Sequence, residues 1–226
     1  MNRSRIAQGL LLGLLGLMAV SALAFKVFQP VQVVPRVRLV PSFVLVDQDG
    51  QTLTSEDLRG KVVLYDFIYT RCPAPCYDLN ETMQAVFAGM DDVLPPDVPM
   101  VLVTISFDPQ YDTPERLKAY AESLGADSTR WIFATTQKES LLKTILGGGF
   151  EVYYQPQGDG TFQFDPRYVL VDGWGIVRGE YRYETLVSNQ ERILRHIGVL
   201  ADEIQNSKGA AKLAYEAAHL FLCYAP

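Results

Sequence analysis

Two cysteines four positions apart, Cys72 and Cys76, have the residue type and spacing best suited to chemistry in this chain. They follow an apolar run of strand length, 61–69, and precede a segment, 78–90, whose apolar residues recur at helical spacing. Cys76 therefore falls near the amino end of a helix, where unpaired amides and the helix dipole favour a thiolate over a thiol. Arg71 adds a positive charge beside Cys72. Because thiolates attack disulfides and also bind soft copper(I), the pair is a candidate for either reaction.

The spacing within the pair bears on which chemistry it performs. Three residues separate Cys72 from Cys76, one more than in the usual two-residue redox motif. The longer loop lets both sulfurs bind one ion while they stay close enough to form a disulfide. An inert structural disulfide is the alternative, since most cysteine pairs outside the cell are of that kind. The strand–loop–helix placement favours a functional pair.

The elements around the pair alternate between strand and helix patterns. Apolar runs of strand length lie at 42–47, 61–69, 99–107, 131–134, 167–172 and 176–181, with one helical turn capped by Thr54 or Ser55 after the first run and helical patterns at 78–90, 113–124, 137–146 and 188–200. This order predicts a layered α/β domain. A central mixed sheet closed by a hairpin and a helix is the thioredoxin-like arrangement, which is the fold class that we expect.

Local signals predict where several helices begin and end. Thr113 precedes a proline and an acid, the residue order that caps a helix and starts its first turn. Three glycines at 147–149 are expected to end the helix over 137–146. Ser188 and Glu191 have the spacing of a capping box and are expected to begin the last helix of the domain.

The first thirty residues indicate a membrane-targeting segment. Arg3 and Arg5 precede an apolar run from 10 to 25, which is the pattern of a signal peptide or a signal anchor whose amino end is cytoplasmic. Both interpretations place the remaining chain outside the cytoplasm. The apolar stretch 6–28 is long enough to span a bilayer. We therefore expect an uncleaved transmembrane signal anchor over 1–28, although the Ala-Leu-Ala sequence at 22–24 fits a cleavage site and leaves removal open.

The remaining chain divides into three parts by composition. Prolines and valines over 29–41 predict an extended linker, and residues 42–204 hold the predicted thioredoxin-like domain. Residues 205–226 predict an apolar tail helix, which Lys212 and Glu216 make too short and too charged to span a membrane. The tail either packs on its own domain or docks on a partner or the membrane surface, and the sequence leaves both open.

Composition excludes some other functions. The net charge of −6 leaves no basic stripe that could neutralise the phosphates of a nucleic acid. Three cysteines are too few for a disulfide-stapled scaffold, so two at close spacing point to chemistry.

Two segments carry a family resemblance. Residues 67–76 have the pattern F-x-Y-T-x-C-P-x-x-C, and residues 106–114 have the pattern S-x-D-P-x-x-D-T-P. On these motifs the chain resembles the Sco/SenC family of thioredoxin-fold copper chaperones, from about residue 41 to about residue 198. The resemblance implies that Cys72 and Cys76 bind copper together with one histidine. It also implies a soluble domain on the periplasmic side of the cytoplasmic membrane, with the cytochrome c oxidase subunit that carries the binuclear CuA site, or another respiratory complex, as partner.

The histidine of that family does not carry over. It lies eight residues before the aspartate that ends a strand, here Asp172, and Phe164 stands in its place. His196 is expected to be a surface or packing residue. His219 and Cys223 have ligand spacing on a helix, but one such pair is weak evidence for a metal. Copper is thus an expected cofactor whose binding the missing histidine weakens.

A second resemblance concerns Pro166. The segment 165–172 is similar to the Pro-x-x-Phe-Leu-Ile-Asp segment of TlpA-like thiol-disulfide oxidoreductases, whose proline is cis and lies against the active cysteines. The resemblance adds Pro166 to Cys72 and Cys76 as a catalytic residue. A trans proline that begins a strand is the alternative. Asp108 and Asp112 match the family motif, and we expect them to shape the loop beside the cysteines by turn capping.

Three functions fit the sequence. The first is a Sco/SenC-like protein that delivers copper to the CuA site of cytochrome c oxidase or keeps its thiols reduced. The second is a thiol-disulfide oxidoreductase with other clients. The third is a structural subunit of a respiratory membrane complex. Copper transfer needs a third ligand, whereas thiol exchange needs only the dithiol and a suitable potential, so the missing histidine weakens copper carriage more.

Overall fold

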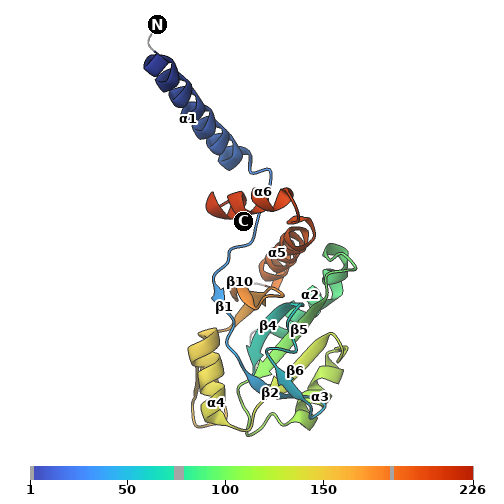
Figure 1. Cartoon of the computed structure of the whole chain (residues 1–226). Helices are drawn as coiled ribbons and strands as arrows, with labels where there is room; N and C mark the ends of the chain where they lie inside the picture. Colours follow the sequence, from blue (N-terminus) through green and yellow to red (C-terminus); the bar gives the residue numbers. More distant parts are fainter. Residues whose placement is uncertain (1–2, 74–78, 184–185, 226) are drawn as a thin grey trace.

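The computed structural model describes residues 3–73, 79–183 and 186–225. It consists of a long N-terminal helix, α1 (Arg3–Phe28), that extends away from an α/β domain (Figure 1). Cys76 lies outside the described residues, and so do the predictions that depend on it.

The domain is built on one eight-stranded sheet of mixed direction. Its order is β1-β10-β9-β4-β5-β6-β2-β3, and β4, β5 and β6 at its centre are parallel. The strands are β1 (Arg38–Leu39), β2 (Val44–Asp47), β3 (Thr52–Thr54), β4 (Val62–Ile68), β5 (Met100–Ser106), β6 (Trp131–Thr135), β9 (Arg167–Val171) and β10 (Ile176–Arg182). The antiparallel β9–β10 hairpin pairs with β4, which confirms the predicted thioredoxin-like sheet.

Helical layers bury both faces of the sheet. The first face packs against α2 (Leu79–Val93), α3 (Pro114–Ser123) and α5 (Leu186–Asn206). The second packs against α4 (Glu139–Lys143) and the π-helical turn that continues it (Thr144–Phe150). Neighbouring residues of β4 face opposite layers: Leu64 belongs to the first core and Tyr65 to the second. The run 62–69 is apolar except for one acid because both faces of β4 are buried.

Two predicted helix boundaries are wrong. The glycines at 147–149 do not end the preceding helix, which continues as the π-turn to Phe150 and ends where Glu151 takes a left-handed φ of 58°. Gly149 has a packing role instead, since a Cβ on it would come within 2.4 Å of Pro41. The last helix does not begin after residue 188, because α5 runs from Leu186 to Asn206.

Some short elements also differ from expectation. Residues 52–54 form strand β3, which was not predicted. The turn expected after it begins at Ser55, where Thr54 Oγ1 accepts the Asp57 amide at 3.3 Å and the Asp57 carboxylate accepts hydrogen bonds from Thr54. A separate hairpin, β7 (Tyr154–Pro156) and β8 (Phe162–Phe164), was not predicted because its short strands are only half-buried. Trp131 is buried in the core, whereas Trp174 in the β9–β10 turn is 80% exposed.

The segment between α1 and the domain is packed against both. Val33 and Val34 are fully buried, and β1 extends the sheet by pairing with β10. The C-terminal tail helix, α6 (Ala211–Leu220), lies across the end of α1 (Figure 1). Residues expected to form a linker therefore contribute to the core.

Candidate functional site

Cys72 lies just beyond the carboxyl end of the central strand β4. At this end of β4 the backbone is still hydrogen-bonded to the chain that leaves β5, because the Phe107 amide donates to the Ile68 carbonyl at 2.9 Å. Cys72 is half-buried against the second core and is disulfide-bonded. Cys223 is buried and free. The predicted pairing of Cys72 with Cys76 involves a residue outside the described ones and stays a prediction.

Asp112 fixes the backbone two residues before Cys72. Its carboxylate accepts the Thr70 amide at 3.0 Å and also accepts the hydroxyls of Thr70 and Ser106. Asp112 and Ser106 are both fully buried, so the Ser106 hydroxyl depends on this carboxylate as its acceptor. It follows β5 in the second family-like motif, and its role is to hold the loops after β4 and β5 together.

Arg71, the residue before Cys72, is paired rather than free to act on the thiol. Its Nε donates to the Asp108 carboxylate at 2.6 Å, and its guanidinium lies 4.7 Å from the centre of the Tyr111 ring. The backbone amide of Asp108 in turn donates to Ser106 Oγ at 3.1 Å. Because a carboxylate shares the Arg71 charge, that charge stabilises a Cys72 thiolate less than the sequence alone indicates.

Phe164 and Pro166 come to the same end of the sheet as Cys72. Tyr168 in β9 pairs with Asp66 in β4, and the strands are antiparallel, so residues just before β9 lie near residues just after β4. The Phe164 ring packs 5.1 Å from the ring centre of Phe107. Pro166 is half-buried, and its carbonyl accepts the Tyr183 amide. Pro166 thus lies at the cysteine end, and its cis geometry stays a prediction.

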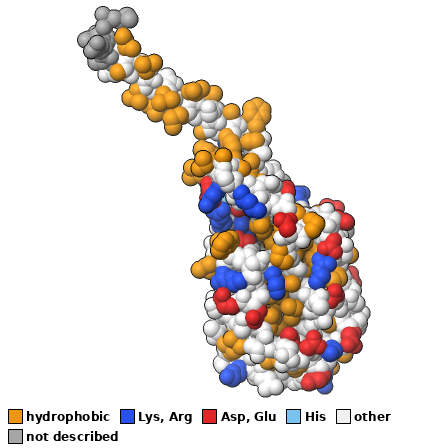
Figure 2. Space-filling model, turned by 45° about the vertical axis from the view of Figure 1, so that its right-hand side comes forward, with side chains coloured by type: hydrophobic (Ala, Val, Ile, Leu, Met, Phe, Trp, Pro, Cys, Tyr) orange, Lys and Arg blue, Asp and Glu red, His pale blue; other side chains and the backbone are white. Residues whose placement is uncertain are grey.

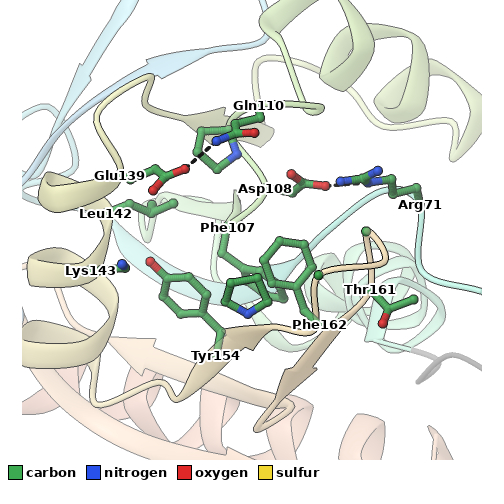
Figure 3. A pocket seen from close by; sticks show the side chains of 14 residues that line it. Arg71, Phe107, Asp108, Gln110, Glu139, Leu142, Lys143, Tyr154, Thr161 and Phe162 are labelled. Atoms are coloured by element: carbon green, nitrogen blue, oxygen red, sulfur yellow. Dashed lines mark hydrogen bonds and ion pairs between the residues drawn. The ribbon is translucent and has the colours of Figure 1, made fainter.

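A cavity of about 300 Å³ opens beside Arg71 (Figure 3). Phe107, Tyr154, Phe162 and Leu142 form its apolar wall, and a hydrogen bond of 2.7 Å between Gln110 and Glu139 crosses its rim. Such a cavity can accept an apolar group. No local pattern in the sequence indicates this cavity, because its walls come from four separate segments of the chain.

Asp66 is a second functional candidate that the sequence analysis missed. It is fully buried in the middle of β4, and neither carboxylate oxygen has a hydrogen-bond partner in the described part of the chain. Burial raises the pKa of Asp66 to about 7. Thr104, opposite Asp66 on β5, acts to lower this pKa, but the effect of burial is larger. The feature of the sequence that could have indicated Asp66 is a single acid within the otherwise apolar strand β4.

Neither histidine joins the cysteine end. His196 packs under β10, where its Nδ1 lies 2.8 Å from the Tyr181 hydroxyl, which confirms a packing role. His219 Nε2 lies 3.0 Å from Glu203 at the tail. Within the described residues, no group of three or more histidine, cysteine, aspartate or glutamate side chains is placed to hold a metal. The Phe164 ring offers no lone pair at the position of the expected histidine.

Comparison with known protein families shows to which family the chain belongs. The SCO1/SenC family model matches residues 32–201. The chain belongs to the SCO1/SenC family. This confirms the resemblance that the two motifs indicated, and it leaves α1 and the tail after residue 201 outside the match.

Individual SCO1/SenC relatives agree in both sequence and structure. A Stutzerimonas stutzeri protein named "Putative copper-binding protein" is 30% identical over 169 residues, which is 74% of this chain and 80% of that protein. A SCO1/SenC family lipoprotein from Bacillus anthracis is 27% identical, with a TM-score of 0.64 over 73% of this chain and 95% of its own. BsSco, described as a Sco-family cytochrome c oxidase assembly protein with a disulfide switch, is 25% identical, with a TM-score of 0.62 over 73% and 94% of the two chains.

Proposed function

We propose that this protein is a membrane-anchored member of its family that acts through the dithiol of Cys72 and Cys76 at the CuA site of cytochrome c oxidase. Support comes from relatives described as copper-binding and as cytochrome c oxidase assembly proteins. Further support comes from Cys72, which is disulfide-bonded and directly follows Arg71, one of the residues that line the cavity.

The observation that carries the choice between copper delivery and thiol reduction is Phe164. Two thiolates can hold copper(I), but a third ligand normally shields the ion and raises its affinity. The aromatic ring packed at the cysteine end supplies no such ligand. Reduction of a disulfide in the copper-site protein is therefore the favoured activity, and copper carriage is the secondary one.

The proposed reduction balances as ordinary thiol–disulfide exchange. One thiolate of the pair attacks a client disulfide and forms a mixed disulfide, and one client thiolate leaves. The second cysteine then breaks the mixed disulfide, which releases the reduced client and leaves the pair oxidised. Two electrons pass to the client, and an external dithiol reductant must restore the pair for the next cycle.

Anchoring rests on α1. From Ile6 to Phe28 it is long and apolar enough to cross a membrane, and its spanning window is not buried against the domain. The basic residues before it favour a cytoplasmic amino end. A reporter that is active only in the cytoplasm, fused to the C-terminus, should then be silent. Reporter activity would contradict the extracytoplasmic placement.

A copper(I) competition with a chelator tests the function. The reduced full-length protein, Phe164→His and Cys72→Ser are compared at one pH. We expect weak binding by the unmodified protein, stronger binding by Phe164→His because the added imidazole supplies a third ligand, and the weakest binding by Cys72→Ser. Tight binding by the unmodified protein with no gain in Phe164→His would favour copper delivery over reduction.

A thiol-exchange assay on the same proteins tests the reductase activity. The unmodified protein should reduce a disulfide in a peptide that carries the two copper-site cysteines of the oxidase. Phe164→Leu, which keeps an apolar side chain, should behave like the unmodified protein in both assays. Failure to exchange with that peptide, together with exchange with an unrelated disulfide substrate, would favour an oxidoreductase with other clients.

A further inference from the structure

The C-terminal tail is tied directly to the end of the proposed membrane helix. The rings of Phe25 in α1 and Phe221 in the tail lie 6.0 Å apart, and Lys26 Nζ donates to the Leu222 carbonyl at 2.8 Å. Just after α1, Val33 pairs with the tail through backbone hydrogen bonds of 3.0 Å to Cys223 and from Ala225. The tail therefore keeps a fixed place next to the last turn of α1.

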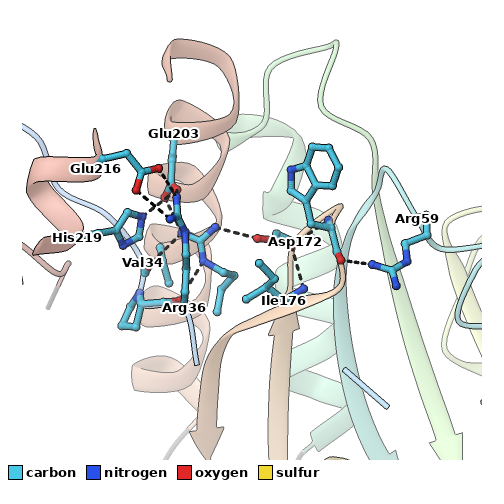
Figure 4. A network of polar contacts seen from close by, with 11 residues as sticks. Val34, Arg36, Arg59, Asp172, Ile176, Glu203, Glu216 and His219 are labelled. Carbon is cyan, nitrogen blue, oxygen red and sulfur yellow. Dashed lines mark hydrogen bonds and ion pairs between the residues drawn. The ribbon is translucent and has the colours of Figure 1, made fainter. Parts of the chain in front are cut away.

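A buried ionic network ties the same tail to the domain (Figure 4). Arg178 in β10, which is almost fully buried, donates to Asp172 at 3.0 Å and to Glu203 in α5 at 2.6 Å. Glu203 is also 3.0 Å from His219 in α6, and Arg36 pairs with both Glu203 and Glu216. Four parts of the chain meet here: the segment after α1, the β9–β10 hairpin, α5 and α6.

The outer side of the tail is apolar and exposed. Leu213 and Leu220 lie seven residues apart on one side of α6 and are each 76% exposed. Leu222 follows them, and Val27 and Phe28 continue the exposed apolar surface from the end of α1. In Figure 2, hydrophobic side chains run from α1 into this junction, and basic side chains gather around it. The exposed lysines nearby in the sequence are Lys26, Lys208 and Lys212.

We propose that α6 lies in the headgroup region of the membrane that α1 spans, with Leu213, Leu220 and Leu222 inserted into the upper part of the acyl chains. This inference rests on the anchor proposed above. The lipid surface is the expected occupant because it surrounds the end of α1 on every side, and the tail is fixed against that end. An apolar helix face flanked by lysines is the composition of an interfacial helix, which inserts about 5–10 Å.

An interfacial position of α6 would also fix the orientation of the domain relative to the membrane. β9 is antiparallel to β4, so the turn at Asp172 lies at the opposite end of the sheet from Cys72. Asp172 and Arg178 connect that opposite end to Glu203 and α6. The tail thus holds the end distant from Cys72 toward the bilayer and directs the cysteine end away from it.

Quenching of tryptophan fluorescence by brominated phospholipids tests the proposal on the full chain in vesicles. Single reporters are introduced as Leu220→Trp or Leu213→Trp in a Trp174→Phe background, in which only the buried Trp131 remains. Leu15→Trp reports on α1, and Val44→Trp, an exposed position on β2, reports on the distant part of the domain. The vesicles carry bromine either high or deep in the acyl chain.

We expect the two tail reporters to lose most fluorescence with bromine high in the chain, and Leu15→Trp to lose most with bromine placed deep. Val44→Trp should not respond. If Leu15→Trp is quenched and neither tail reporter is, the interfacial tail is refuted while the anchor stands. If Leu15→Trp is also unquenched, the anchor fails and the tail proposal fails with it. Blue-shifted tail reporters without quenching would mean that a protein surface covers α6, which also overturns the proposal.

Discussion

The Asp112 carboxylate accepts the backbone N–H of Thr70 at 3.0 Å and so connects the loop after β5 to the chain that leads into Cys72. The two residues are 42 positions apart in the sequence, and each lies in one of the two motifs that define the family resemblance. The motifs therefore form one structural unit in which the second motif supports the first.

Asp112→Ala should destabilise the protein by about 1–3 kcal/mol, because it leaves the Thr70 amide and the buried Ser106 hydroxyl without their acceptor. Urea unfolding of the full chain in detergent measures the change. The control is Asp49→Ala, which removes an exposed ion pair with Lys118 and should cost less than about 1 kcal/mol. Equal losses in the two variants would contradict the supporting role of Asp112.

Cys72 and Cys76 should form a reversible disulfide that excludes Cys223. Cys223 is fully buried in the tail cluster with Val33 and Ala218, so it is not accessible to either cysteine of the pair. Thiol trapping followed by peptide mapping, with and without a reductant, identifies the partners. Cys223→Ser should leave the redox behaviour unchanged, whereas a peptide that links Cys223 to Cys72 would show the expectation to be wrong.

Asp66 should make stability fall as pH rises through neutrality. Its folded pKa of about 7 lies above its ordinary value of 3.8, so the stability present below pH 4 is lost progressively up to and through pH 7. The full loss is on the order of 4 kcal/mol. Asp66→Asn cannot ionise, so it should be more stable than the unmodified protein at pH 8 and differ much less at pH 5.

Urea unfolding at the two pH values measures this effect. Asp57→Asn is the control: hydrogen bonds from Thr54 lower the pKa of the exposed Asp57, so its contribution is lost only at pH values below its ordinary pKa of 3.8 and should not differ between pH 5 and pH 8. If Asp66→Asn and the unmodified protein show the same pH dependence, Asp66 is not the group that titrates.

Arg178→Met should cost about 3–5 kcal/mol, because it leaves Asp172 and Glu203 buried without their shared cation. It also removes the donors to the Val34 and Pro35 carbonyls, so hydrogen exchange should quicken over residues 33–40. The control, Arg130→Met, breaks an exposed pair with Asp91 and should cost less than about 1 kcal/mol. Unchanged exchange over 33–40 would mean that Arg178 does not hold this segment.

The sequence by itself determined the parts of this protein that depend on local pattern. The continuous apolar run through β4, the helical spacing of α2 and the cap at Thr113 follow from residue types within a few positions of one another. The cysteine motif and the family also follow from short segments. The lone acid at Asp66 was visible in the same way, but its pKa depends on the strands on either side of β4, which a local pattern does not show.

Only the tertiary structure decided the surroundings of the site and the place of the tail. The three glycines at 147–149 lie within a helical turn, and Gly149 approaches Pro41, more than a hundred positions earlier in the chain, too closely for any side chain. Phe164 meets Phe107, and Glu203 meets Arg178 and His219, by the same kind of long-range contact. Such contacts form because buried charges need partners and apolar surfaces need cover. The sequence shows which residues are charged or apolar. Only the fold determines which distant residue pairs with each buried charge or covers each apolar surface.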